Sequence, residues 1–125
     1  PQAHPEPRGF FARHMVLNYC PLLYLDAGGR NLTPDRLPRD YRDAMEAICD
    51  AALIELLGTL EPEWVLGVGK YAHQRLVHVR ARTAASWKVA ACLHPSPASP
   101  AANRDWAGQV RAQWRRQGLP EPCPV

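Results

Sequence analysis

The chain has 125 residues, enough for one domain built around one hydrophobic core. Its composition, 46% hydrophobic and 22% charged, is typical of a folded globular protein and excludes a disordered or fibrous one. A net charge of +3 permits a polyanionic partner without requiring one. No apolar run reaches the ~18 residues of a membrane-spanning helix, and residues 1–9 lack the basic and apolar regions of a secretory signal. We therefore expect a folded domain without a membrane contact.

Four cysteines stand far apart in the chain and form no CxxC pair. Their spacing matches neither a zinc site nor the disulfide framework of a small secreted domain. We interpret them as small buried hydrophobic residues of a reduced compartment. They are Cys20, Cys49, Cys92 and Cys123.

The first predicted elements are an irregular lead-in and a strand. Residues 1–9 contain three prolines and no initial Met, which predicts an extended or disordered segment at a cut or spliced edge. The apolar run at residues 14–17 predicts a strand covered on both faces. Asn18 then follows the carboxyl end of that strand.

A long amphipathic helix is predicted from residue 40 to the Glu-Pro-Glu sequence at 61–63. Thr33 and Pro34 predict a helix start before it, which Pro38 breaks or restarts. Apolar side chains recur at steps of three and four, typical of a helix that packs one face on a core. They are Tyr41, Ala44, Met45, Ile48, Cys49, Ala52, Leu53, Leu56 and Leu57.

A second buried strand is predicted at residues 64–69, and Gly67-x-Gly69-Lys70 then opens a helix. A glycine-rich turn between a strand and a helix can bind phosphate with its backbone amides. Neither of the phosphate-binding motifs GxGxxG and GxxxxGK[ST] is complete, so we favour a tight turn over a nucleotide site. Close passage of a DNA phosphate at this turn is the alternative.

A third strand is predicted at residues 87–93, ending at His94 and a proline-stiffened loop. The helix expected at 103–117 places Trp106, Val110 and Trp114 on one stripe, and Arg104, Arg111 and Arg115 on another. Strands that alternate with helices predict an α/β fold with a parallel sheet flanked by helices.

Asn18 and His94 each end a predicted strand, so parallel packing would place both on the same rim of the sheet. An amide can read a base edge, a histidine can stabilise developing negative charge, and the arginines can contact phosphates. The alternative interpretations are a turn residue for Asn18, a rigid connector around His94 and a solvated helix face for the arginines.

Several motifs together resemble the single-strand-selective monofunctional family of the uracil-DNA glycosylase superfamily. They are HMVLNYCPLL at 14–23, GRNLTP at 29–34, ICDAA at 48–52, VLGVG at 65–69, and LHPSP at 93–97 continued by PxANxxW at 100–106. The resemblance covers residues 10–118 as part of one domain, with 1–9 as the lead-in and 119–125 as a tail. It implies a three-layer fold whose N-terminal side, including a core strand, lies upstream of these residues.

What the resemblance implies is a base-excision repair enzyme that flips uracil or a related oxidised pyrimidine out of DNA and hydrolyses its glycosidic bond without cutting the strand. Asn18 would hydrogen-bond the uracil and His94 would stabilise the departing base. Arg104 and the wedge loop would contact the DNA, and no metal or organic cofactor is implied. The wedge consists of Pro95, Ser96, Pro97, Ala98, Ser99 and Pro100. A monomer acting on single- and double-stranded DNA in the nucleus is expected.

The sequence departs from that family in three respects, one of which is a diverged tail after Leu119. The family's motif that positions the attacking water lies upstream of the residues present here. In the wedge, Ala98 stands where the family has an arginine, and Ser99 stands at the next position. We therefore expect a truncated form with weak or no activity of its own. The alternatives are a non-catalytic DNA-binding fragment or interaction module, and an unrelated small α/β domain.

Overall fold

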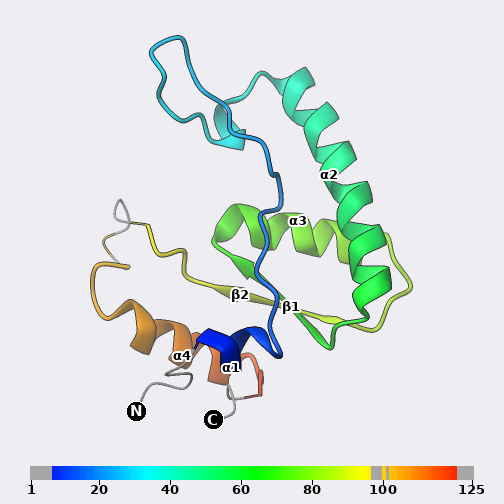
Figure 1. Cartoon of the computed structure of the whole chain (residues 1–125), viewed down its shortest axis with the longest axis vertical. Coiled ribbons are helices and arrows are strands. Elements are labelled where there is room, and N and C mark those ends of the chain that lie inside the picture. The colour runs from blue at the N-terminus through cyan, green and yellow to red at the C-terminus, as the bar shows by residue number, and fades with distance from the viewer. Residues whose placement is uncertain (1–6, 97–99, 101, 121–125) are drawn as a thin grey trace. The chain divides into compact units, whose positions relative to one another are not determined.

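The computed structural model describes residues 7–96, 100 and 102–120, which form two compact units (Figure 1). The sheet unit comprises the described residues of Pro1–Leu17 and Pro62–Val125, and the helical unit comprises Asn18–Glu61. Parts of the predicted lead-in, wedge and tail lie outside the described residues: 1–6, Pro97, Ala98, Ser99, 101 and 121–125.

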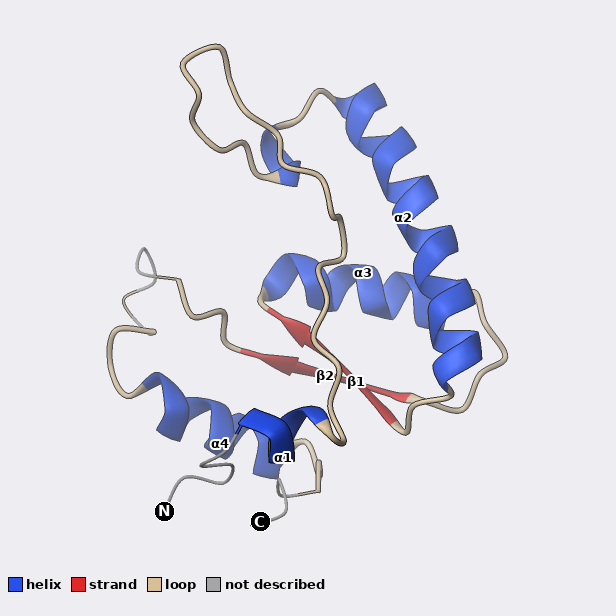
Figure 2. Cartoon of the chain, in the orientation of Figure 1, coloured by secondary structure: helices blue, strands red, loops and turns tan. Residues whose placement is uncertain are grey.

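The sheet unit is built on a parallel pair of strands, which makes it an α/β structure (Figure 2). Strand β1 (Trp64–Val68) and strand β2 (Lys88–Cys92) are joined by helix α3 (Lys70–Arg80), as the βαβ pattern predicts. Helix α3 packs against both strands, and helix α4 (Trp106–Arg116) packs against β2. Val79, Trp87 and Ala90, all at most 4% exposed, lie in the core of this unit.

The third strand predicted at residues 14–17 is absent, and that prediction was wrong. Helix α1 (Pro7–Phe11) precedes this segment, and the N–H of His14 still bonds the carbonyl of Phe10 at 3.0 Å. Met15 and Val16 are 61% and 69% exposed. A strand needs a neighbour for its backbone groups, and none of the described segments pairs with residues 14–17. The sheet therefore has two strands where three were expected.

The two edges of the sheet differ. At the outer edge of β2, the side-chain amide of Gln117, the residue that follows α4, bonds both the N–H (2.8 Å) and the C=O (2.7 Å) of Ala91. On β1 the register directs the backbone groups of Leu66 away from β2, and no described residue bonds them. The outer edge of β2 is thus bonded at Ala91, whereas no described residue bonds the outward groups of Leu66 on β1.

The helical unit contains the long helix that the sequence predicts. Helix α2 (Arg39–Leu60) begins directly after its N-cap Pro38, and a short 3₁₀ turn, η1 (Pro34–Arg36), ends two residues before that proline. Its buried face packs Met45 and Cys49 against Leu37, with Tyr19, Cys20, Tyr24 and Leu32 around them. The helix ends at Glu61 in a left-handed conformation (φ 44°). None of the helices in the described ranges is long and apolar enough to cross a membrane.

Helix α4 starts three residues later than predicted. Asp105 takes a left-handed conformation (φ 47°), and its carboxyl group accepts a hydrogen bond from the N–H of Gly108, which caps the helix. Arg104 therefore lies in the preceding turn rather than on the helix. The predicted stripe of three arginines was wrong in this respect, because only Arg111 and Arg115 share the helix.

Candidate functional site

His94 lies just beyond the carboxyl end of β2, with the turn between β1 and α3 beside it. The N–H of Ser96 bonds the carbonyl of His94 at 2.8 Å, which closes a tight three-residue turn around Pro95. Proline fixes φ at the centre of this turn and restricts the residue before it, so the backbone at and after the histidine has little freedom. The stiff connection that the sequence predicts at His94 is present up to Ser96.

Gly69 provides the contact surface for His94. It has φ +89° and directly precedes α3, and its N–H bonds the carbonyl of Cys92 at 2.8 Å, which ties the ends of the two strands together. A Cβ at position 69 would lie 3.1 Å from the Cβ of His94 and 3.4 Å from its Cδ2. Glycine is required here by both its backbone angle and its neighbour. The tight strand-to-helix turn predicted from Gly67-x-Gly69 is confirmed.

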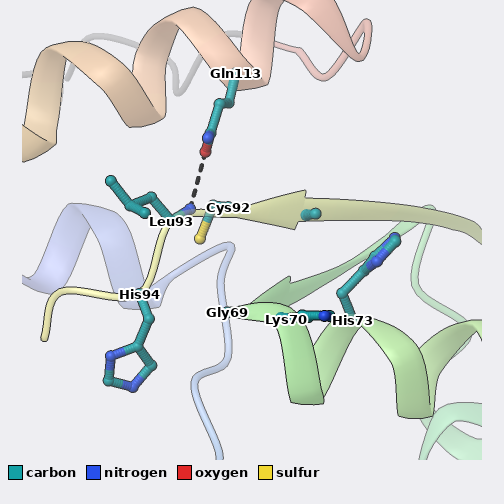
Figure 3. A pocket seen from close by; sticks show the side chains of 8 residues that line it. Gly69, Lys70, His73, Cys92, Leu93, His94 and Gln113 are labelled. Atoms are coloured by element: carbon teal, nitrogen blue, oxygen red, sulfur yellow. Dashed lines mark hydrogen bonds between the residues drawn. The ribbon is translucent and has the colours of Figure 1, made fainter. Parts of the chain in front are cut away.

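An open cavity of about 270 Å³ lies between these two turns (Figure 3). Lys70, His73 and His94 contribute cationic or ionisable side chains to it, and the first N–H groups of α3 add positive potential. The site is therefore suited to stabilise negative charge on a ligand. Burial raises the pKa of the Cys92 thiol at the cavity wall, which keeps that thiol neutral and a poor nucleophile.

Helix α4 holds the residue before His94. The N–H of Leu93 donates to Oε1 of Gln113 at 2.8 Å (Figure 3), and the carbonyl of Leu93 accepts from Nε1 of Trp106 at 2.7 Å. The sequence pattern did not predict a role for Gln113. Its i, i+4 spacing from Gln117 places both amides on one helix face, but only the packed structure identifies that face as the one along β2.

Asn18 belongs to the helical unit, so its predicted pairing with His94 stays a prediction. Its side chain is exposed. The next residue, Tyr19, is anchored: its hydroxyl lies 2.7 Å from Oδ1 of Asp50 and 3.2 Å from the carbonyl oxygen of Glu46. Asp50 is 1% exposed, so this anchor lies inside the unit and fixes the backbone beside Asn18 to α2.

The remaining predicted site residues lie on the surface. Pro95, Pro100 and Arg104 are exposed, and Ser96 is half-buried. Arg111 and Arg115 are exposed on α4. Among the described residues no group of three His, Cys, Asp or Glu side chains is arranged to hold a metal ion.

Curated proteins that match 91% of the chain include the single-strand-selective monofunctional uracil-DNA glycosylases of Rattus norvegicus (42% identical), Mus musculus (41%) and Bos taurus (40%). The chain is similar to part of each of these proteins. It spans only 41% of the rat and mouse glycosylases and 42% of the bovine one. No family model matches the chain. The homology confirms the resemblance seen in the motifs and makes an unrelated α/β domain untenable.

Proposed function

We propose that this chain is the portion of a DNA base-excision repair glycosylase that binds a flipped uracil, or a related oxidised pyrimidine, and stabilises its departure. The observation that carries this proposal is the placement of His94 against Gly69 at the first turn of α3. A base that leaves as an anion gains most from donors and positive potential that are already fixed in place. The names of the relatives point to the same substrate.

In this proposal His94 donates a hydrogen bond to the uracil as negative charge develops on it. Lys70 and the amides at the start of α3 contact a DNA phosphate nearby. Asn18 reads the uracil edge through its amide and rejects cytosine, whose donor and acceptor pattern is reversed. The wedge from Pro95 to Pro100, with Arg104 beside it, enters the DNA stack. No cofactor takes part.

We further propose that the complete protein has the three-layer fold of its superfamily and acts as a monomer on DNA in the nucleus. The chain spans less than half the length of the relatives it matches, and what supports the proposal is that the resemblance implies a water-positioning motif outside these residues. Loss of such a group removes the ~10²–10⁴-fold that general acid–base assistance contributes. The 125-residue chain should therefore release uracil weakly or not at all.

The test is single-turnover uracil release from single-stranded DNA that carries one uracil. The chain and the mouse relative are compared at equal concentration, and the chain should be at least ~10²-fold slower. Turnover as fast as that of the relative would contradict the truncation proposal. His94→Leu in a protein that also contains the upstream part should lower the rate by a similar factor, whereas His78→Leu, in the last turn of α3, should not.

The second candidate is a DNA-binding module without chemistry, which the exposed Arg111 and Arg115 on α4 favour. Binding carried by phosphate contacts falls steeply with salt and ignores the base, with log K falling by about 0.7 per contact for each unit of log salt on single strands. Equal affinity for DNA with and without uracil, together with a slope reduced by Arg111→Gln, would support this candidate. Tighter binding of the uracil-containing strand would support the glycosylase.

A further inference from the structure

The peptide group that joins Leu93 to His94 is held from outside the sheet. Strand β2 ends at Cys92, so no ladder with β1 fixes Leu93. Its N–H bonds Gln113 and its carbonyl bonds Trp106, and both side chains come from α4. Figure 3 shows Gln113 reaching Leu93 from one side, while the imidazole of His94 points to the other.

The hydrogen bonds of α4 along β2 divide into two sets. Gln117 holds Ala91, a residue inside the strand that β1 already fixes through its neighbours. Gln113 and Trp106 hold Leu93, which lies beyond the strand and directly before His94. The first set bonds the edge of a strand, and the second set fixes the position of the backbone that leads into His94.

We propose that Gln113 and Trp106 are positioning residues for His94. Gly69 confines the imidazole on one side, the turn at Pro95 confines the backbone after it, and α4 confines the backbone before it. A histidine that stabilises a leaving group acts only within a few tenths of an ångström of its productive position. This inference rests on the proposed function of His94 and adds the side chains that hold it in place.

The first experiment follows the amide exchange of Leu93 and Ala91 and the ring signals of His94 by NMR in the 125-residue chain. Gln113→Ala should speed exchange at Leu93 about fivefold to tenfold, as expected for one lost hydrogen bond, and should shift and broaden the His94 ring signals. Gln113→Glu keeps an acceptor oxygen and should restore slow exchange. Trp106→Phe, which keeps an aromatic ring but removes the N–H donor, should also disturb the His94 signals.

Gln117→Ala is the matched control, because it removes an amide of the same kind from the same helix face. It should speed exchange at Ala91 and leave the His94 ring signals in place. The positioning role is overturned if Gln113→Ala leaves Leu93 and His94 unchanged. It is equally overturned if Gln117→Ala disturbs His94 as much, since both glutamines would then act only on general stability.

The second experiment measures single-turnover uracil release with the same variants in a protein that includes the upstream part. Gln113→Ala and Trp106→Phe should slow release about tenfold at saturating enzyme, with affinity for the DNA within twofold, and Gln117→Ala should change neither. Normal NMR behaviour of His94 with slowed release would overturn the inference. A third outcome separates the two proposals. If Gln113→Ala disturbs the His94 signals but the unsubstituted protein with the upstream part releases no uracil, the positioning is supported and the proposed function is contradicted.

Discussion

Gly67 lies inside β1 at the point where the strand meets the first turns of α3. A Cβ at this position would lie 2.5 Å from Cα of His73 and 2.6 Å from its backbone nitrogen, so helix and strand would have to separate. Gly67→Ala should therefore destabilise the sheet unit by about 3 kcal/mol, the upper end of the range for overpacking, and lower Tm by roughly 10–20 °C. Thermal unfolding followed by circular dichroism measures this.

The control for Gly67 is Gly58 in α2, where a Cβ would meet nothing within 4 Å. Gly58→Ala should stabilise the chain by about 0.5–1 kcal/mol, because alanine restricts the unfolded chain and favours the helix. A Gly67→Ala variant as stable as the original chain would contradict the close contact between β1 and α3.

Ionisation of Cys49 should lower the stability of the helical unit at high pH. Burial, followed by the neighbouring Cys20, raises the pKa of the Cys49 thiol from 9.0 to about 11. Folding therefore favours the neutral thiol, and its stabilising contribution is complete below pH 9 and is lost as the pH rises from 9 to about 11. Urea unfolding between pH 8 and pH 11 should show this fall, and Cys49→Ala, which has no thiol to ionise, should flatten it. An unchanged pH profile in Cys49→Ala would refute the assignment.

At the scale of elements, the sequence predicted what depends on local pattern. The period of three and four residues identified α2, the buried runs identified β1 and β2, and Pro38 marked where α2 begins. The predicted strand at residues 14–17 failed because an apolar run becomes a strand only beside a partner. The start of α4 was misplaced because the period alone does not reveal the left-handed backbone of Asp105.

In the candidate site, too, some residues were predictable from local sequence and others were not. His94 and Gly69 were predictable because proline and glycine restrict or free the backbone by themselves, and the structure brings them together. Gln113 and Trp106 were not predictable as hydrogen-bond partners of Leu93, because that role depends on which strand edge α4 packs against. The pairing of Asn18 with His94 depends on the arrangement of the two units and stays a prediction.

Within the helical unit, Tyr19 joins the segment that carries Asn18 to α2. Tyr19→Phe removes the hydroxyl beside the carboxyl group of Asp50, which is 1% exposed, and should cost about 1–3 kcal/mol. Tyr41→Phe removes the same hydroxyl from a side chain that is 66% exposed and should change stability by less than ~0.5 kcal/mol. Urea unfolding of the two variants compares them, and equal effects would show that the buried hydrogen bond contributes nothing.

Over the sheet as a whole, the two edges differ in how their outward backbone groups are hydrogen-bonded. Gln117 bonds the outward groups of Ala91 on β2, and Gln113 and Trp106 bond those of Leu93 just beyond it, whereas the outward groups of Leu66 on β1 have no described partner. An open edge can accept a further strand, and a closed edge cannot. The exposed apolar side chains of Met15, Val16 and Val68, also in the sheet unit, are further surface that a larger protein would have reason to cover.

Amide exchange tests this asymmetry in the chain itself. The N–H of Leu66 should exchange at least ten times faster than the N–H of Val65, which faces β2, and faster than those of Ala91 and Leu93.

Proline substitution tests the same point independently, because proline removes one N–H and is tolerated where that N–H faces away from the sheet. Leu66→Pro should leave the pairing of β1 with β2 intact, whereas Val65→Pro should break it and unfold the sheet unit. Equal damage from the two prolines, together with slow exchange at Leu66, would mean that the outer edge of β1 is already occupied. In that case the place open to a further strand would have to be sought elsewhere in the molecule.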